Sequence, residues 1–208
     1  MMHLLLLFFV TFSAGFMATV PPGLLNMNAA KISVEKGKQN GVLFSLGVST
    51  MIMLQSYVAV LISKFFYKNP EVIEVLLKVA FFVFIGLAIY FFIAGKKQKP
   101  KTPIQVAVSK KNSYFKGLFL AGINLLTIPY YSGLHAMWKQ TGWIKFEATD
   151  IITFVLASGL GTFAVMYLYT FYFNKLELKT NRFGAYANYT IAILMVVLSV
   201  ITAFRIFM

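Results

Sequence analysis

The chain has 208 residues, of which 59% are hydrophobic and only 12% charged, and its net charge is +13. Soluble domains average about 45–50% apolar and about 25% charged residues, so this composition excludes an ordinary soluble domain and indicates a membrane protein. The absence of cysteine excludes disulfides, thiolate metal sites and a cysteine nucleophile. The basic residues fall in short connectors between apolar runs, which favours membrane orientation and contact with anionic lipid over nucleic-acid binding.

Six apolar runs are long enough to cross a bilayer, which takes about 20 residues of helix. They cover roughly residues 4–29, 41–63, 72–94, 115–138, 151–173 and 185–207. The connectors are too short to hold a second domain, so we predict an all-α integral membrane protein that forms one polytopic domain over residues 1–208. The first run resembles the apolar part of a signal peptide, but it lacks a preceding Lys or Arg and a clean cleavage site, so we expect it to be retained.

The first run contains a stretch that a continuous helix would not tolerate, ATVPPGLLNMNAAK. Proline removes a backbone donor and clashes with the preceding turn, so Pro22 and Gly23 predict a helix break. We expect a short second half-helix to begin near Leu24, with N-terminal amides that suit a carboxylate. Asn26 and Asn28 supply hydrogen-bond donors and acceptors beside it. The alternative is a structural kink capped by asparagine.

Two other runs are rich in small residues, which let helix backbones approach closely. In the second run they recur every four positions, at Gly37, Gly41, Ser45 and Ser49. Ala157 and Gly161 do likewise in the fifth run. Both helices are expected to pack at the centre of the bundle, and Gln55 of the second run is expected to line a cavity.

The fourth run carries a second predicted break. Pro129 interrupts it at Thr127, with Asn124 a turn earlier, and Tyr130 is expected to line a cavity. His135 follows, and it is the titratable side chain that we expect inside a span. It is either a proton carrier, since histidine titrates near physiological pH, or a neutral interfacial or hydrogen-bonded histidine.

Lysine and arginine are unevenly distributed among the connectors. The first, third and fifth connectors hold most of the 19 basic residues, so they are predicted to be cytoplasmic, with both termini outside. Trp138 and Trp143 bracket the fourth connector, as anchors at the outer interface do.

The two halves of the sequence resemble each other. Phe12 and Gly15 precede the first break as Phe115 and Gly117 precede the second, and a Gly/Ser-rich helix follows each break. Three helices in each half give the halves opposite orientations, although chance matching among apolar residues is an alternative. We predict two inverted three-helix repeats, over about 1–95 and about 115–208, with interrupted helices one and four and a basic cytoplasmic connector over 95–116. This arrangement indicates a transporter with a site near the membrane midplane.

Short motifs resemble those of the lysine-exporter (LysE-type) family of amino-acid translocators over nearly the whole chain. Residues 22–23, 37–41 and 46–47 read PG, GKQNG and LG, where that family typically shows Pro-Gly-Pro, Gly-Arg-Arg-x-Gly and Leu-Gly. Phe115, Gly117 and Asn124 resemble its second-half signature. The resemblance implies efflux of amino acids or similar small metabolites from the cytoplasm, driven by proton antiport, through a bacterial inner membrane.

The chain also departs from that family pattern. Leu24 and Leu125 stand where the family has proline, and Leu25 stands where an acidic residue is often found. Substrate class and coupling ion therefore stay open. Because the six acids fall in connectors or at helix ends, a zwitterionic amino acid fits better than a cationic one.

The leading hypothesis is therefore a secondary transporter for a small molecule. Its predicted substrate-binding residues are Pro22, Gly23, Asn26, Asn28, Gln55, Asn124, Thr127, Pro129 and Tyr130, with His135 as the proton-coupling candidate. The alternative is a non-transporting membrane partner or lipid-handling protein, in which the basic connector docks anionic lipid or an acidic protein. H-E-x-x-H, G-x-S-x-G and P-loop motifs do not occur, so we expect no enzyme, metal, cofactor or ATP-driven pump. The oligomeric state is open, a homodimer included.

Overall fold

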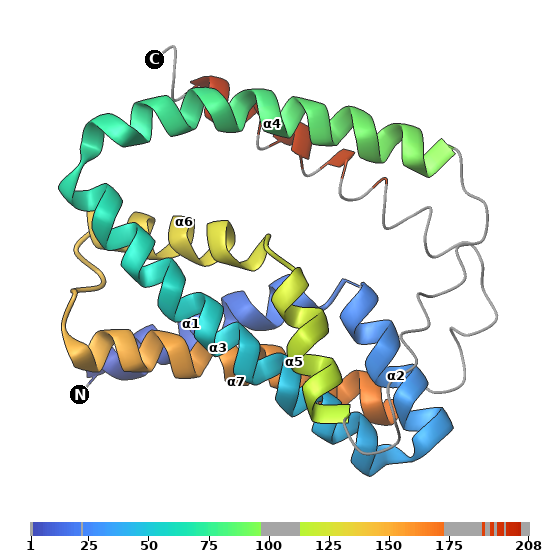
Figure 1. The fold of residues 1–208 in the computed structure, drawn as a ribbon. Coiled ribbons are helices and arrows are strands. Elements are labelled where there is room, and N and C mark those ends of the chain that lie inside the picture. The colour runs from blue at the N-terminus through green and yellow to red at the C-terminus, as the bar shows by residue number, and fades with distance from the viewer. Residues whose placement is uncertain are drawn as a thin grey trace. The chain divides into compact units, whose positions relative to one another are not determined.

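The structure, a computed structural model, describes residues 2–21, 23–96, 113–172, 189, 192–193, 195–197 and 199–204. All regular structure in these residues is α-helical (Figure 1), which confirms the predicted all-α class. The helices are α1 (Met2–Thr19), α2 (Leu24–Lys36), α3 (Lys38–Lys68), α4 (Pro70–Lys96), α5 (Ser113–Ile123), α6 (Thr127–Gln140) and α7 (Ala148–Tyr172).

Several of these helices could cross a membrane. Among the described residues, α1, α3 and α7 are each long and apolar enough, and α5 with α6 passes the same test as one span bent by 67°. Shorter apolar helical segments lie at Phe81–Ile93 within α4 and at Met195–Phe204 within the predicted last run. Three or four candidate spans are therefore seen, and the predicted six remain a prediction.

The chain divides into two compact units. The first comprises residues 1–65 and 107–178, and it contains both predicted helix breaks. The second comprises residues 66–106 and 179–208. Within this second unit the ring of Tyr189 packs edge-on against Phe92 of α4, at 6.0 Å between centroids.

Helix α1 is apolar on every side but buries only one stripe. Leu7, Thr11 and Gly15 are buried, and their spacing of four residues places them on one helix face. A Cβ atom at Gly15 would lie 2.9 Å from the backbone oxygen of Ser158, so this face packs tightly on α7. The remaining faces expose large apolar side chains, among them Leu5, Leu6, Phe9 and Met17. Such a surface suits lipid rather than water.

Helices α1 and α7 lie side by side and run in the same direction (Figure 1). His3 contacts Asp150 near the start of both helices, and Thr19 contacts Thr162 farther along both. The two candidate spans therefore cross the first unit in parallel.

Helix α3 runs antiparallel to α7. Ser45, early in α3, contacts Thr170, late in α7. Ser56, later in α3, contacts Ser158, earlier in α7. The predicted small-residue face of the second run thus packs against α7.

Helix α3 runs parallel to the bent pair of α5 and α6. The hydroxyl of Tyr114, at the start of α5, donates to Thr50, and His135 of α6 contacts Ser63 near the end of α3. Both ends of the bent pair therefore lie beside α3 and run in the same direction along it.

Glycine allows two of these helix pairs to touch backbone to backbone. A Cβ at Gly117 would overlap the backbone oxygen of Phe44, which brings α5 against α3, and a Cβ at Gly161 would overlap that of Phe12, which brings α7 against α1. Gly37 does not share the predicted packing face. It ends α2 with a positive φ of 89°, and a Cβ there would meet nothing within 4 Å, so it serves the turn into α3.

Candidate functional site at the two helix breaks

The first break lies where the prolines predict it. Helix α1 ends at Thr19 and α2 begins at Leu24, as expected, after an extended Gly23 (φ −133°, ψ −177°). Pro22 lies outside the described residues. The predicted interruption of a single span is corrected in one respect, because α1 is by itself long enough to cross a membrane. The break therefore stands at the end of a full-length helix rather than in its middle.

Both predicted asparagines lie at this break and bind its backbone. Asn26 is buried, and its Nδ2 donates to the carbonyl oxygens of Thr19 (2.6 Å) and Pro21 (3.0 Å). The last carbonyls of a helix have no partner within the helix, and that of Thr19 finds one in this side-chain amide, as does the Pro21 carbonyl just beyond the helix. Asn28, also buried, donates to Leu24 O at 2.7 Å. Asn26 thus caps the end of α1, as in the alternative of a kink capped by asparagine, whereas Asn28 bonds to a carbonyl in the first turn of α2.

The second break is displaced from its predicted position. Helix α5 ends at Ile123 and α6 begins at Thr127, so the interruption covers Asn124 to Leu126 rather than Thr127 to Pro129. Pro129 lies in the first turn of α6, where its missing N–H would have had no helical partner. Asn124 and Pro129 are exposed, whereas Thr127 is buried.

Gln55 reaches the second break from α3. Its side chain is 5% exposed, and Nε2 donates to the backbone oxygens of Ala121 (3.1 Å) and Asn124 (3.3 Å). The other amide atom, Oε1, is buried and has no hydrogen-bond partner among the described residues. Of the predicted residues, Gln55 and Asn124 are therefore in direct contact.

Tyr169 holds the first break as Gln55 holds the second. The Tyr169 hydroxyl, from α7, donates to Val20 O at 2.9 Å. Gln55 and Tyr169 follow Gly47 and Gly161, respectively, by the same number of residues. Sequence reasoning missed Tyr169, and the signal that could have found it is this alignment of the two Gly/Ser-rich helices.

The two breaks are brought close together by the start of α6. Tyr130 donates from its hydroxyl to Ala14 O of α1 at 3.0 Å. A Cβ at Gly15 would lie 2.9 Å from the hydroxyl oxygen of Tyr131. The first turns of α6 therefore pack on α1 just before α1 reaches its own break.

A cluster of hydroxyl groups fills the space between α1, α3, α6 and α7 at this level. Thr19 lies 3.4 Å from Thr162, oxygen to oxygen, and Ser158 donates to Ser56 at 2.9 Å. The hydroxyl oxygen of Tyr131 and the backbone oxygen of Ser158 would each lie 2.9 Å from a Cβ at Gly15, so Tyr131 lies beside this cluster. Hydroxyls both donate and accept, so this polar cluster can bind neutral or zwitterionic groups without a buried charge of its own.

His135 lies apart from the breaks, farther along α6. It is fully buried, and its Nδ1 lies 3.0 Å from Ser63 Oγ. The ring stacks on Phe146 at 5.2 Å between centroids and meets Phe154 edge-on. Its Nε2 has no partner among the described residues. His135 is therefore hydrogen-bonded inside the protein rather than interfacial.

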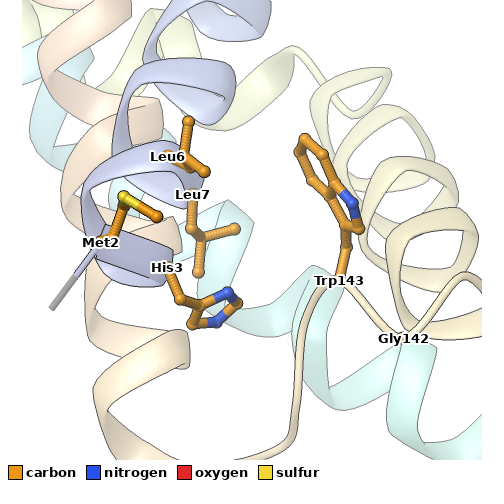
Figure 2. A pocket seen from close by; sticks show the side chains of 6 residues that line it. All are labelled: Met2, His3, Leu6, Leu7, Gly142 and Trp143. Atoms are coloured by element: carbon orange, nitrogen blue, oxygen red, sulfur yellow. The ribbon is translucent and has the colours of Figure 1, made fainter.

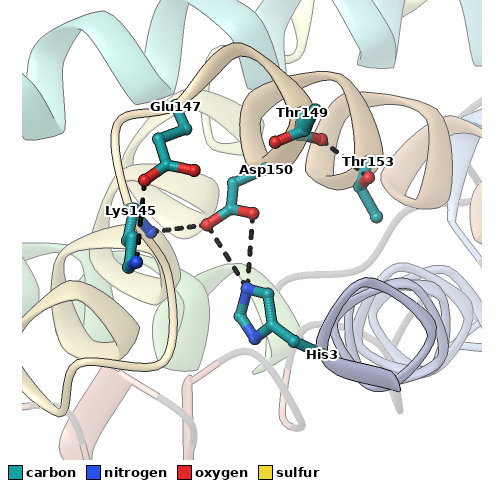
Figure 3. A network of polar contacts seen from close by, with 6 residues as sticks. All are labelled: His3, Lys145, Glu147, Thr149, Asp150 and Thr153. Carbon is teal, nitrogen blue, oxygen red and sulfur yellow. Dashed lines mark hydrogen bonds and ion pairs between the residues drawn. The ribbon is translucent and has the colours of Figure 1, made fainter. Parts of the chain in front are cut away.

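A second polar network joins the starts of α1 and α7 (Figure 3). Of the acids whose side chains the structure describes, Asp150 is the buried one. It accepts a hydrogen bond from the backbone N–H of Lys145 at 2.7 Å, and its oxygens lie 3.3 and 3.4 Å from His3 Nε2. The sequence placed Asp150 at a helix end but gave no sign of a partner 147 residues away.

An open, largely apolar pocket of about 310 Å³ lies at the same end of the bundle. Figure 2 shows His3 and Trp143 facing each other across it. It is lined by Met2, His3, Leu6, Leu7, Gly142 and Trp143, none of which is a predicted substrate residue. Among the described residues there is no cluster of side chains that could hold a metal ion.

A comparison with protein-family models decides the class of this molecule. The model of the LysE type translocator family matches residues 16–204. The chain belongs to the LysE type translocator family. No curated protein and no solved structure matches it. As a LysE type translocator it is a multi-pass membrane protein that transports amino acids or related compounds, in a family of translocators rather than enzymes.

Proposed function

We propose that this LysE type translocator is a secondary transporter that exports amino acids or related small metabolites from the cytoplasm by alternating access. The observation that carries the proposal is the pair of helix breaks, each contacted by a side chain from the second span of the other half, Gln55 of α3 or Tyr169 of α7. Interrupted helices in corresponding positions of two repeats are the arrangement that secondary transporters use to build a midplane site.

Helix directions and glycine contacts support the inverted repeat. Helix α1 is parallel to α7, α3 is parallel to α5 and α6, and α3 is antiparallel to α7. The backbone contact of Gly161 with α1 has a counterpart in the contact of Gly47 with α5. Each contact joins the second span of one half, α7 or α3, to the first span of the other, α1 or the α5–α6 pair, as a two-fold axis in the membrane plane requires.

This proposal includes the finer architecture expected from the sequence. One polytopic domain over residues 1–208 would contain six spans in two repeats, about 1–95 and about 115–208, joined by the basic cytoplasmic connector 95–116. Both termini would lie outside a bacterial inner membrane. The lysine distribution and the alternating helix directions support that topology.

The proposed substrate site combines both breaks with the polar cluster between them. We retain Gly23, Asn26, Asn28, Gln55, Asn124, Thr127, Pro129 and Tyr130 from the sequence, together with Pro22, and propose Tyr131, Ser158 and Thr162 in addition because they lie in or beside the polar cluster. The described residues at this level carry amides and hydroxyls rather than carboxylates. A zwitterionic substrate fits this inventory better than a cationic one. His135 remains the proposed coupling residue for proton antiport, as the buried imidazole beside Ser63.

Counterflow in proteoliposomes tests the proposed function. Vesicles containing the purified protein are preloaded with one unlabelled amino acid, and uptake of the labelled form is followed with and without a pH gradient. We expect accelerated exchange of at least one zwitterionic amino acid, and accumulation when a pH gradient is imposed. Exchange that no pH gradient can drive would refute proton coupling. No exchange of any amino acid by folded protein would refute the proposed function.

A further inference from the structure

Gln55 carries a buried acceptor that the fold itself does not use. Its Nε2 donates to Ala121 O and Asn124 O, so both amide hydrogens have a backbone partner. This pairing fixes which amide atom is nitrogen and which is oxygen. The oxygen, Oε1, is then an oriented acceptor at the second break, buried and without a donor among the described residues. Buried polar groups in native proteins nearly always have a hydrogen-bond partner, so a donor for Oε1 is expected when the protein works.

We infer that Gln55 Oε1 accepts a hydrogen bond from the ammonium group of the substrate, and that this contact makes transport selective for compounds with a primary amine. The inference rests on the proposed function and assigns the amine end of the substrate to the second break. An ammonium group has three donors and no acceptor, so it complements an amide oxygen whose own N–H groups are occupied.

Charge at the second break favours this assignment. The buried carboxylate of Asp150 lies at the start of α7 and is already bonded to His3 and to the Lys145 backbone. The polar contacts of Gln55, in contrast, are with the backbone carbonyls of Ala121 and Asn124. Where a carboxylate is lacking, carbonyl oxygens at an interrupted helix bind cations in transporters. The acceptor therefore suits the single positive charge of a zwitterion, whose carboxylate keeps the net charge at zero.

Comparison with Tyr169 distinguishes the proposed binding of the substrate ammonium group from hydrogen bonding to the backbone at the break. Tyr169 occupies the equivalent place on α7 and holds Val20 O through a hydroxyl group. At the first break this hydroxyl and the side-chain N–H groups of Asn26 act as donors to the backbone. Gln55 provides a carbonyl oxygen in addition, and that oxygen is the feature to be explained by a ligand.

The test compares substrates with and without the amine in three variants. Each of the twenty proteinogenic amino acids is used as a labelled tracer in counterflow. Its uptake is competed with the same amino acid unlabelled or with the matching carboxylic acid that lacks the amino group. Gln55→Leu and Gln55→Glu both lose the two Nε2 contacts to the backbone, but Gln55→Leu also removes the acceptor, whereas Gln55→Glu keeps an oxygen acceptor and adds charge. Tyr169→Phe is the control that loses the equivalent contact at the first break.

In the wild type we expect the amino acid to compete at least about tenfold better than its amine-free analogue, the discrimination typical of a hydrogen bond to a charged group. Gln55→Leu should bring the two within about twofold, Gln55→Glu should keep or increase the preference, and Tyr169→Phe should keep it. An undiminished preference in Gln55→Leu, or a lost one in Gln55→Glu, would overturn the inference while leaving the transport function intact. If Gln55→Leu does not fold, the Gln55→Glu result decides. Failure of the wild type to exchange any amino acid would overturn both.

Discussion

At the scale of single residues, glycine decides how closely the helices of this translocator approach. Gly117 faces the backbone oxygen of Phe44 so closely that a methyl group has no room. Gly133, on α6, meets nothing within 4 Å. These two helical glycines therefore separate the effect of packing from the general preference of helices for alanine, which favours alanine over glycine by about 1 kcal/mol.

Gly117→Ala should destabilise the protein by about 1–3 kcal/mol, because α5 must move away from α3 to accommodate the new methyl group. Gly133→Ala should leave stability unchanged or raise it slightly. Thermal unfolding of both variants in detergent, measured beside the wild type, checks the prediction. Equal midpoints for the two variants would show that the α3–α5 contact is looser than described.

His135 offers a second test at this scale. It is buried beside Ser63 and lies apart from the breaks. His135→Gln should therefore retain counterflow exchange of substrate but lose accumulation driven by a pH gradient, because glutamine can hydrogen-bond to Ser63 but cannot carry a proton. Accumulation that survives the substitution would place coupling at another group.

Single residues also show which contacts could be predicted from the sequence and which could not. Asn26 was predictable because it follows a proline break that leaves carbonyls without partners. The pairing of His3 with Asp150 was not, because contact between the starts of two helices depends on their parallel packing. Gln55 was expected at a cavity, but its two backbone partners depend on where α5 ends.

At the scale of helices, the two breaks differ in kind. The first follows a complete span, whereas the second divides one span into two bent pieces. The sequence marked both through proline, but it placed the second break too late, because Pro129 in the first turn of a helix starts that helix rather than ending the previous one. Proline thus locates a break only to within a turn.

Helix pairing can be tested by cross-linking, since the chain has no native cysteine. The side-chain oxygens of Ser56 and Ser158 lie 2.9 Å apart, so the Ser56→Cys/Ser158→Cys variant should form a disulfide after mild oxidation. Protection from a maleimide mass label, reversed by reductant, reports the bond. The Ser45→Cys/Ser158→Cys variant should stay labelled, because Ser45 pairs farther along α7, with Thr170. Cross-linking of the control pair instead would contradict the antiparallel register of α3 and α7.

At the scale of the whole molecule, the composition sufficed to predict a helical membrane protein, and short motifs sufficed to predict the translocator family, which the family comparison confirms. The six-span inverted repeat remains a proposal. Its support comes from contacts between helices far apart in the sequence, such as Tyr169 with Val20. Periodicity and hydropathy describe one helix at a time, so they could not have revealed these contacts.

The central claim is that transport takes place at the helix breaks, and the most direct test is counterflow by Asn26→Ala beside Asn40→Ala. Both asparagines donate to a carbonyl at a helix end, but Asn26 does so at the first break and Asn40 at Lys36, the last residue of α2. With equal amounts of folded protein in the vesicles, Asn26→Ala should abolish exchange of an amino acid that the wild type transports, and Asn40→Ala should retain it. Undiminished exchange by Asn26→Ala would contradict a substrate site at the breaks.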